Sequence, residues 1–450
     1  MDLQGRRVLI VGLGKSGLAA ARLCLNLGAQ VTATDLSPDP AGAAELAAAG
    51  AALSLGGHRE EDFQAADLVV LSPGVDPRRP EIARARERGA EVIGELELGW
   101  RFLSAPAVMV TGTNGKSTVT TLVGRMLAAS GRRVFVGGNL GTPLCDFLLR
   151  GQEVDWAVLE VSSFQTDTMV RLRPAVGVVL NLSPDHLDRY PDFAAYADSK
   201  LRLLANQADD DLAVLCMDDP EVAARAERAP ARVWGYGGEG PHQPGGWLED
   251  GRLVLCPGPG QTLAIDASRS PLVGAFNRLN LLAAALAALA AGADPWAIQA
   301  SVLAFRGLPH RLQLVGRHQG RFWFDDSKAT NPAAVKAAVA ALDRPLVLLL
   351  GGRAKEGCSF AVLAPELAGP VQGVVAFGEA GPAIARELEG LTRLELAADL
   401  PAAVEAARRM TREGDTVLLA PGCSSFDAYH SYAQRGRHFQ ALVKGEPWRN

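Results

Sequence analysis

The stretch Thr111-Gly112-Thr113-Asn114-Gly115-Lys116-Ser117-Thr118 is the most informative segment of this chain. An apolar run at 107–110 precedes it, and a helical pattern at 119–129 follows. Strand, glycine loop and helix in that order are the context that a phosphate-binding loop needs, in which backbone N–H groups and a helix N-terminus can point at phosphate oxygens. Lys116 can reach the β and γ phosphates, and Ser117 or Thr118 can bind Mg²⁺. We therefore expect the chain to bind ATP or a close relative.

This loop is shorter than the general phosphate-binding pattern. That pattern places four residues between its two glycines, whereas only Thr113 and Asn114 separate Gly112 from Gly115. The alternative interpretation is a plain glycine turn between a strand and a helix. The preceding strand and the Lys-Ser-Thr ending argue against that alternative.

Length, charge and cysteine spacing limit the class of protein. A chain of 450 residues is too long for one ordinary core, so two to four domains are expected. The formal net charge of −5 gives no support for general nucleic-acid binding. The N-terminus leads into a strand without a signal peptide, and the longest apolar run, 279–293, is short for a membrane span. Six cysteines without paired spacing predict reduced thiols in a cytoplasmic protein.

The first segment, residues 1–98, alternates strands with helices and predicts a Rossmann-like parallel sheet. Its expected strands are 7–11, 30–34 and 68–71, and its expected helix is 18–27. Gly12-Leu13-Gly14-Lys15-Ser16-Gly17 is a GxGxxG motif, and Asp35 ends the next strand. Taken alone, this pattern indicates a dinucleotide site.

Two further α/β segments follow. Residues 99–304 form a predicted central domain of the P-loop ATPase type, and residues 305–450 a second Rossmann-like domain. Gly- and Pro-rich patches at 235–246 and 256–260 predict hairpins and loops in the central domain. The expected fold class is α/β with three domains.

Candidate catalytic groups follow strands of the central domain. Glu160 ends an apolar strand, where a magnesium contact belongs; the alternative is a helix cap or a solvated acid. His186, beside Asp185, also follows a strand, although a lone histidine is more often structural. Lys200 is expected on a helix, and its default interpretation is a surface lysine. Only seven of the 45 basic residues are lysines, so a lysine can mark a position that requires an amine.

The third domain offers polar groups at its strand ends. Arg311 can clamp a phosphate or form a salt bridge between domains. Asp326, in Asp326-Ser327-Lys328-Ala329-Thr330-Asn331, can hold a ribose or cap the helix that starts near Pro332. The loops at 351–355 and 420–427 also follow apolar strands. In an open α/β sheet these ends share one edge, where ligands bind.

Together and in this order, these motifs resemble the Mur ligase family over essentially the whole chain. The stretches that carry the resemblance are 111–118, 160–165, 185–190, 307–311, 326–331 and 422–425. The Asp-Ser-Lys-Ala-Thr-Asn string is similar to that of the family members that add D-glutamate to UDP-N-acetylmuramoyl-L-alanine. The Asp-Asn-Pro-Arg motif of the members that add diaminopimelate or lysine is absent.

The resemblance implies a cytoplasmic step of peptidoglycan precursor synthesis, the pathway that supports cell shape and division. ATP would phosphorylate the carboxylate of UDP-N-acetylmuramoyl-L-alanine, and the amine of D-glutamate would attack the acyl phosphate. It implies two magnesium ions, one held by Ser117 and Glu160 and the other by His186 and Lys200, with Lys200 carbamylated. We expect Lys116 to neutralise charge during phosphoryl transfer. No membrane insertion and no nucleic acid are expected, and a monomer is the default.

The resemblance also assigns binding residues by position. For ATP they are Gly112, Thr113, Asn114, Gly115, Lys116, Ser117, Thr118, Asn277, Asn280, Arg311 and Asp326. For the uridine substrate they are Lys15, Ser16, Asp35, Leu36, Gly74, Asn139, Ser162 and His186. For D-glutamate they are Lys328, Thr330, Lys355, Ser425 and Tyr432. Lys15 and Leu36 depart from the family's usual residues at these positions.

Three alternative functions remain on the sequence alone. A folylpolyglutamate synthase is another ATP-dependent amide ligase, but it needs no uridine-binding domain and usually has Gly-Ser after the loop lysine. An NAD-dependent oxidoreductase would leave the loop at 111–118 and the third domain unexplained. A nucleotide-binding switch would not need a second metal.

Overall fold

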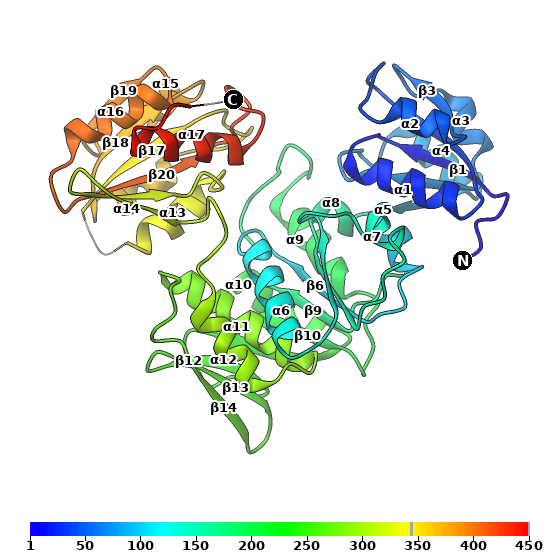
Figure 1. The fold of residues 1–450 in the computed structure, drawn as a ribbon, viewed down its shortest axis with the longest axis horizontal. Coiled ribbons are helices and arrows are strands. Elements are labelled where there is room, and N and C mark those ends of the chain that lie inside the picture. Colours follow the sequence, from blue (N-terminus) through cyan, green and yellow to red (C-terminus); the bar gives the residue numbers. More distant parts are fainter. Residues whose placement is uncertain (343–344, 449–450) are drawn as a thin grey trace. The chain divides into compact units, whose positions relative to one another are not determined.

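The computed structural model describes residues 1–342 and 345–448, which form three α/β sheets (Figure 1). Contacts divide the chain into two compact units. One comprises Met1–Leu182, Ala194–Ser268 and Asn280–Val302; the other comprises Ser183–Phe193, Arg269–Leu279 and Leu303–Asn450. The first two sheets belong to the former unit and the third sheet to the latter.

The first sheet is parallel throughout, with strand order β3-β2-β1-β4-β5. Its strands are β1 (Arg7–Val11), β2 (Gln30–Asp35), β3 (Ala52–Leu55), β4 (Leu68–Leu71) and β5 (Glu91–Gly94). Its helices are α1 (Lys15–Asn26), α2 (Ala43–Ala48), α3 (Glu60–Ala65), α4 (Pro80–Glu87) and α5 (Glu95–Trp100). The order reverses at β1, so the loop after β1 lies where ligands bind in such sheets.

Alternate residues of the first sheet face two apolar layers. Val8 and Ile10 pack on α1, whereas Leu9 and Val11 pack with Phe63 of α3. This alternation follows from the two-residue repeat of a strand that is buried on both faces. The same core includes Cys145 of α7 (Leu144–Leu148), which lies beside α1 and α5 (Figure 1). Helix α7 therefore joins the first domain to the second.

The central sheet has nine strands in the order β14-β13-β12-β11-β10-β9-β6-β8-β7. Its strands are β6 (Ala107–Thr111), β7 (Val134–Gly138), β8 (Trp156–Glu160), β9 (Val176–Val179), β10 (Leu212–Cys216), β11 (Arg232–Gly237), β12 (Gly245–Glu249), β13 (Arg252–Gly258) and β14 (Gln261–Asp266). Strands β12, β13 and β14 form antiparallel hairpins, and the Gly/Pro-rich patch at 256–260 lies at the second of them, whereas the patch at 235–246 contains the loop between the parallel strands β11 and β12. The other strand pairs are parallel.

Helices cover the parallel part of the central sheet. They are α6 (Lys116–Ala129), α7, α8 (Ser163–Thr166), α9 (Phe193–Leu201), α10 (Pro220–Ala223), α11 (Ala275–Ala290) and α12 (Pro295–Ala304). Helix α6 starts at Lys116, three residues before its predicted start, because the polar Lys-Ser-Thr turn hides the apolar repeat. No helix in the described ranges is long and apolar enough to cross a membrane.

The third sheet has the order β15-β16-β20-β17-β18-β19. Its strands are β15 (Gln313–His318), β16 (Arg321–Asp325), β17 (Leu346–Gly351), β18 (Val371–Phe377), β19 (Leu394–Ala397) and β20 (Thr416–Gly422). Its helices are α13 (Pro332–Ala340), α14 (Ala364–Leu367), α15 (Gly381–Glu387), α16 (Leu400–Met410) and α17 (Tyr432–Lys444). Only β15 runs antiparallel, paired with β16 at the edge.

The prediction of three α/β domains is therefore matched by three sheets. All six cysteines are free thiols, and Cys358 is the one that is not buried, in line with the expectation of reduced thiols.

Candidate active site

The predicted phosphate-binding loop connects β6 to α6. Gly112 and Gly115 have φ angles of +140° and +87°, which side chains rarely adopt. A Cβ atom at Gly115 would come within 2.4 Å of Oδ1 of Asn280. Only glycine fits there, and Asn280, one of the predicted nucleotide contacts, lies directly against the loop.

Asn181, which follows β9, fixes the shape of this loop. Its carbonyl accepts from the N–H of Thr113 at 2.7 Å, and its Oδ1 accepts from the N–H of Asn114 at 2.8 Å. Its Nδ2 donates to the carbonyl of Asn114 at 3.0 Å. The loop is thus preorganised by a residue for which we predicted no role. An asparagine after a buried strand could have signalled it, but the hydrogen bonds join segments far apart in sequence.

Lys116 folds back over the loop. Its Nζ donates to the carbonyls of Gly112 and Thr113, both at 2.8 Å. These bonds hold the ammonium over the loop, beside the backbone that a phosphate group would contact. The predicted position of Lys116 is therefore compatible with phosphate binding.

Glu160 ends β8 and is buried beside the loop. Ser117 Oγ donates to its Oε2, and Asn139 Nδ2 donates to its Oε1 at 2.6 Å. Three predicted functional residues therefore meet at one carboxylate. Glu160 is neither solvated nor a helix cap, because Ser162 is the N-cap of α8 and forms a capping box with Gln165. Ser162 thus has a structural role whatever else it contacts.

Lys200 lies on α9 and is only 2% exposed, so the surface interpretation is wrong. Its Nζ lies 4.8 Å from the centre of the Tyr196 ring. The hydroxyl groups of Tyr196 and Thr113 are 3.1 Å apart, which ties α9 to the phosphate-binding loop. A lysine in this position is protected from solvent and close to the loop's supporting residues.

The loop after β1 has a different construction. The N–H of Leu13 donates to Asp35 Oδ2 at 2.6 Å, and the N–H of Ser37 donates to Asp35 Oδ1 at 2.8 Å. A Cβ atom at Gly17 would lie 1.8 Å from the carbonyl oxygen of Gly12, so glycine is required for this close approach. Lys15 Nζ donates to the carbonyl of Gly141 in the central domain.

Other predicted uridine contacts surround this loop. Leu36 is 60% exposed, and Ser16 is half-buried at the start of α1. Gly74 is exposed in the turn after β4. Ser72, at the start of the same turn, donates its hydroxyl to the carbonyl of Gly12 at 2.8 Å, and this role was not predicted.

In the third domain, one buried arginine organises the ligand edge of the sheet. Arg435 of α17 is 0% exposed. Its Nε donates to Ser327 Oγ at 3.0 Å, and its Nη2 donates to the carbonyls of Ser327 and Cys423 at 2.9 and 3.0 Å. Its Nη1 donates to the carbonyl of Ser424 at 3.1 Å. Burial lowers its pKa to about 10, so it remains charged at neutral pH.

A second buried network supports the same edge. His310 Nδ1 lies 2.6 Å from Asp325 Oδ2, and Gln440 Nε2 donates to the same oxygen at 2.7 Å. The N–H of Ser327 donates to Asp325 Oδ1 at 2.9 Å. Arg435 and Asp325 therefore hold the segment that presents Lys328. Sequence patterns did not reveal either role, because burial of a polar side chain depends on distant segments.

The predicted D-glutamate residues occupy these loops. Lys328 Nζ lies 4.0 Å from the centre of the Tyr432 ring, a cation–π contact between two predicted residues. Ser425 is buried after β20, and Thr330 is half-buried. Lys355 Nζ donates to Asp185 Oδ1 at 2.5 Å.

The carboxyl group of Asp326 interacts electrostatically with the guanidinium group of Arg311. Burial raises the pKa of Asp326 to about 7, and the positive charge of Arg311 opposes that rise. The helix-cap interpretation of Asp326 is wrong, because Asn331 caps α13 through its Oδ1, which accepts from the N–H of Ala334 at 2.8 Å. Asn277 Nδ2 donates to the carbonyl of Val273 at 2.8 Å.

His186 belongs to the segment Ser183–Phe193, which is part of the compact unit that contains the third sheet. Its φ angle is +53°, and its Nε2 lies 3.7 Å from Asp185 Oδ2. Across residues 1–342 and 345–448, no cluster of three or more His, Cys, Asp or Glu side chains could hold a metal ion. The assignment of His186 and Lys200 to a metal remains a prediction.

Family models match nearly the whole chain. The Mur ligase MurD-like N-terminal domain matches residues 6–94, and the Mur ligase middle domain matches residues 110–288. The Mur ligase glutamate ligase domain matches residues 310–423.

Individual proteins match over comparable lengths. A UDP-N-acetylmuramoylalanine--D-glutamate ligase of Desulfosudis oleivorans is 45% identical, and the alignment covers 99% of this chain and 97% of that protein. A protein of the same name from Anaeromyxobacter dehalogenans is 46% identical over 98% of both chains. The solved structure of a pseudomurein peptide ligase type C from Methanothermus fervidus has a TM-score of 0.61 at 20% identity, over 92% of this chain and 96% of that one. That structural likeness shows a shared fold.

Proposed function

Because the chain belongs to the Mur ligase family, we propose that it uses ATP to join D-glutamate to UDP-N-acetylmuramoyl-L-alanine. We infer these substrates from the names of relatives that are 45–46% identical to this chain over nearly the full length of both proteins. The structural observation that carries the proposal is the meeting of Ser117, Asn139 and Glu160 beside the loop that holds Lys116.

Phosphoryl transfer would take place at the phosphate-binding loop. Asn181 occupies the N–H groups of Thr113 and Asn114 and fixes the loop, so Lys116 and the N-terminus of α6 would stabilise negative charge on the phosphates. The donor set of one carboxylate and one hydroxyl fits Mg²⁺, which is usually bound by one or two carboxylates together with substrate phosphates. Ser117 and Glu160 would hold the ion, and it would neutralise charge on the transferring group when bound.

The proposed reaction has two steps, phosphorylation of the carboxylate and attack by the amine. A carboxylate oxygen of UDP-N-acetylmuramoyl-L-alanine bonds to the γ-phosphorus as the bond to ADP breaks. The amine nitrogen of D-glutamate then bonds to the carbonyl carbon, loses its proton to a base, and phosphate leaves with the original carboxylate oxygen. The buried surroundings of Glu160 and Thr113 would limit hydrolysis of the acyl phosphate.

The third domain would supply D-glutamate. Lys328 and Lys355 offer two cations for the two carboxylates of this amino acid, and Thr330 and Ser425 offer hydroxyl groups. Arg435 and Asp325 hold the segment that carries Lys328 through hydrogen bonds to Ser327. A substrate carboxylate on Lys355 would replace the contact with Asp185. We assign adenosine contacts to Asn277, Asn280, Arg311 and Asp326.

The first domain would bind the uridine diphosphate portion. Asp35 already organises the loop after β1 through the N–H of Leu13. We assign the remaining contacts to Lys15, Ser16, Leu36 and Gly74, and a contact with the substrate's muramoyl portion to Asn139.

Lys200 and His186 would serve a second magnesium ion. Carbamylation would convert the buried Lys200 amine into an anionic ligand. Carbon-13 bicarbonate should then give a carbamate signal that is absent from Lys200→Arg, and equal signals would contradict the assignment. We propose that the enzyme acts in the cytoplasm as a monomer and would test its mass in solution by light scattering.

Phosphate release tests the proposed reaction. The purified chain should release phosphate from ATP only when UDP-N-acetylmuramoyl-L-alanine and D-glutamate are both present. L-glutamate should not replace D-glutamate. Release with a folate and L-glutamate would instead support a folylpolyglutamate synthase, the less supported alternative, and hydride transfer from NADH would support an oxidoreductase.

A further inference from the structure

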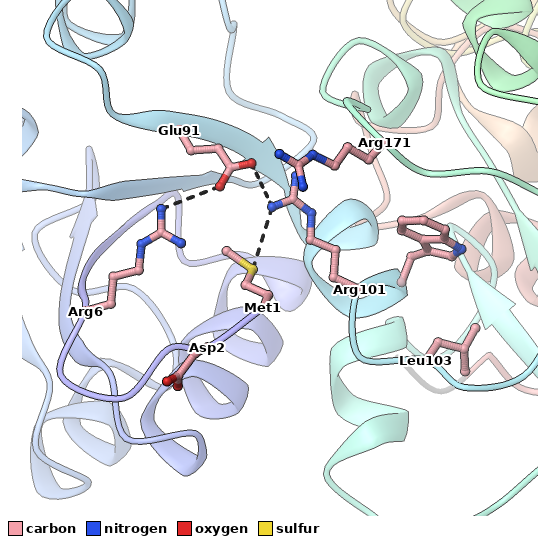
Figure 2. A pocket seen from close by; sticks show the side chains of 8 residues that line it. Met1, Asp2, Arg6, Glu91, Arg101, Leu103 and Arg171 are labelled. Carbon is pink, nitrogen blue, oxygen red and sulfur yellow. Dashed lines mark hydrogen bonds and ion pairs between the residues drawn. The ribbon is translucent and has the colours of Figure 1, made fainter.

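A cavity of about 620 Å³ lies in the unit that contains the first two sheets (Figure 2), and none of its lining residues is one assigned to catalysis. Its volume is within the range of small-molecule sites. Its lining is rich in arginine and consists of Met1, Asp2, Arg6, Glu91, Trp100, Arg101, Leu103 and Arg171.

The cavity is distinct from the proposed uridine site. Arg6 precedes β1 and Glu91 begins β5, so both lie at the amino ends of parallel strands. The residues assigned to the uridine substrate follow the carboxyl ends of β1, β2 and β4. Amino and carboxyl ends of parallel strands lie on opposite edges of a sheet, so the two sites occupy opposite edges.

The cavity is lined by more arginine side chains than carboxylates. Glu91 is shared by Arg6, at 3.6 Å, and by Arg101, at 2.7 Å. Asp2 accepts from the backbone N–H of Gln4. The guanidinium group of Arg171 is exposed and has no hydrogen bond or ion pair within the described parts of the chain. Two lining carboxylates, Asp2 and Glu91, therefore face three guanidinium groups, and Glu97, outside the lining, pairs with Arg101.

Arg101 carries a donor that the protein does not satisfy. Its side chain is 8% exposed, Nε donates to Glu97 Oε1 at 2.8 Å, and Nη1 contacts Glu91 and the sulfur of Met1. Its Nη2 is buried and has no hydrogen-bond partner in the described residues. A buried N–H without a partner is costly, so an acceptor from a ligand would be stabilising here.

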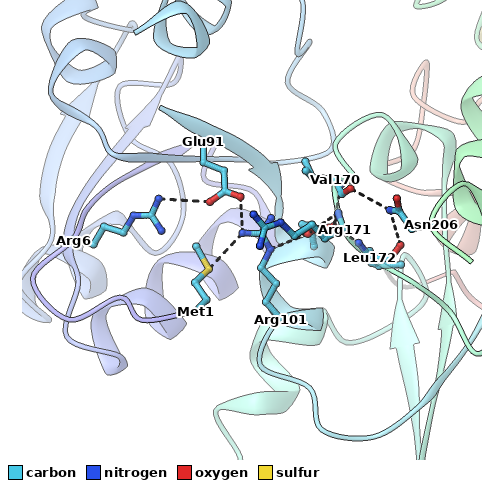
Figure 3. Close-up of polar contacts among 9 residues, drawn as sticks. Met1, Arg6, Glu91, Arg101, Val170, Arg171, Leu172 and Asn206 are labelled. Atoms are coloured by element: carbon cyan, nitrogen blue, oxygen red, sulfur yellow. Dashed lines mark hydrogen bonds and ion pairs between the residues drawn. The ribbon is translucent and has the colours of Figure 1, made fainter. Parts of the chain in front are cut away.

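The backbone around Arg171 is held firmly in place (Figure 3). The carboxylate of Glu97 accepts from the N–H groups of Val170, Arg171 and Leu172 at 3.1, 3.2 and 2.9 Å. Asn206 Nδ2 donates to the carbonyls of Val170 and Leu172, both at 3.1 Å. Glu97 lies on the helix that precedes Arg101, so one carboxylate fixes both arginine-bearing segments.

We propose that this cavity binds the phosphate or diphosphate group of a small metabolite, through Arg6, Arg101 and Arg171. A carboxylate is satisfied by a single guanidinium fork, whereas a phosphate group has enough oxygens to accept from several forks at once. Arg6 comes from the first domain and Arg171 from the second. A bound phosphate group therefore bridges these two domains.

Calorimetric titration of the full-length protein with inorganic pyrophosphate tests the site. Pyrophosphate can also bind the loop at Lys116, so the site is identified by the difference between the wild type and Arg171→Ala. Arg171 is exposed and its backbone bonds to Glu97 remain in the variant. We expect Arg171→Ala to lose one class of sites or to weaken it about tenfold or more, with turnover unchanged.

Matched variants distinguish specific binding of pyrophosphate in the cavity from a general effect of the protein's positive charge. Arg132→Ala removes an exposed arginine outside the cavity and should bind like the wild type. Arg101→Lys keeps the charge but lacks the unsatisfied Nη2 donor, so it should also bind more weakly. Glu91→Gln removes the competing carboxylate and should bind more tightly.

Four results would overturn the proposal. These are equal pyrophosphate affinity in the wild type and Arg171→Ala, equal loss in Arg132→Ala, wild-type binding by Arg101→Lys, and weaker binding by Glu91→Gln. In a parallel titration, citrate that binds the Arg171-dependent site more tightly than pyrophosphate would contradict the choice of phosphate over carboxylate.

Discussion

Two glycine loops of this molecule, 12–17 and 112–118, each connect a parallel strand to a helix, yet they are built for different partners. In the second, Asn181 binds the loop backbone and Lys116 lies over the carbonyls of Gly112 and Thr113. In the first, the anionic Asp35 already accepts from a loop N–H. The loop at 112–118 thus carries a lysine ammonium group, whereas the loop at 12–17 carries the negative charge of Asp35.

Their lysines show the same contrast. Lys116 bonds within its own loop, whereas Lys15 reaches out to the carbonyl of Gly141. A lysine that stays over a glycine loop can stabilise charge during phosphoryl transfer. A lysine that points away contributes at most to binding. A Gly-Lys-Ser string therefore has a meaning only together with the loop geometry around it.

The largest expected effect comes from Lys116→Ala. Loss of this ammonium should reduce phosphate release by about a thousandfold, because the transition state loses a fixed positive charge. Turnover by the purified variant measures the effect. Lys15→Ala is the control and should retain its kcat; similar losses of kcat in both variants would contradict the contrast between the two loops.

The next effect concerns Glu95, at the contact between the domains that carry the two loops. Its Oε1 accepts from the N–H of Cys145 on α7, and its Oε2 is buried without a partner. Burial raises its pKa from 4.5 to about 7. Because the folded state keeps the proton that the unfolded state loses, stability should fall as the pH rises from 4.5 to 7 and then level off.

Glu95→Gln removes this titration. The variant should lose a pH-dependent difference of about 3 kcal/mol in the free energy of unfolding of this unit. Urea unfolding at several pH values measures it. Glu61→Gln alters an exposed carboxylate and should keep the wild-type pH profile. A profile of Glu95→Gln that is as steep as the wild type would show that Glu95 ionises freely.

A smaller effect is expected at the first loop. Asp35→Asn removes the charge that organises the N–H of Leu13 and should raise KM for the uridine substrate about tenfold, with little change in KM for ATP. Steady-state kinetics with each substrate varied gives both constants. Asp39→Asn, at an exposed aspartate of the same turn, should leave them unchanged. A rise in KM for ATP alone would contradict the assignment of Asp35 to the site of the uridine substrate.

The smallest effect belongs to Lys15. An exposed ammonium near a diphosphate contributes little after solvent screening, so Lys15→Ala should raise KM for the uridine substrate by about threefold. An unchanged KM would show that Lys15 makes no contact with this substrate and serves only to bind the carbonyl of Gly141.

The sequence was sufficient for the features that depend on local patterns. Buried strands such as β1 and β4 were predicted at their observed bounds, and the glycine loop led directly to Lys116 and Glu160. Strands β3 and β5 were missed although β4 is equally short, because all four residues of β4 are apolar, whereas Ser54 interrupts β3 and β5 begins with Glu91 and ends with Gly94. These short strands complete the first sheet through pairing, which no local pattern reports.

Residues whose role depends on long-range burial could not be predicted. Arg435 is separated by 108 residues from Ser327, to which it donates, and Asn181 by 67 residues from Asn114. Lys200 was expected on the surface by default, yet the fold buries it. A charged or polar side chain gives no local signal of burial, because its partners come from other strands and helices.

Isotope transfer gives the sharpest evidence on the proposed reaction. UDP-N-acetylmuramoyl-L-alanine with both oxygens of its free carboxylate labelled with oxygen-18 would be turned over with ATP and D-glutamate. If the carboxylate is phosphorylated before the amide forms, each phosphate released carries one labelled oxygen, as mass spectrometry would show. Amide product accompanied by unlabelled phosphate would contradict an acyl phosphate and, with it, the proposed use of the loop at 112–118.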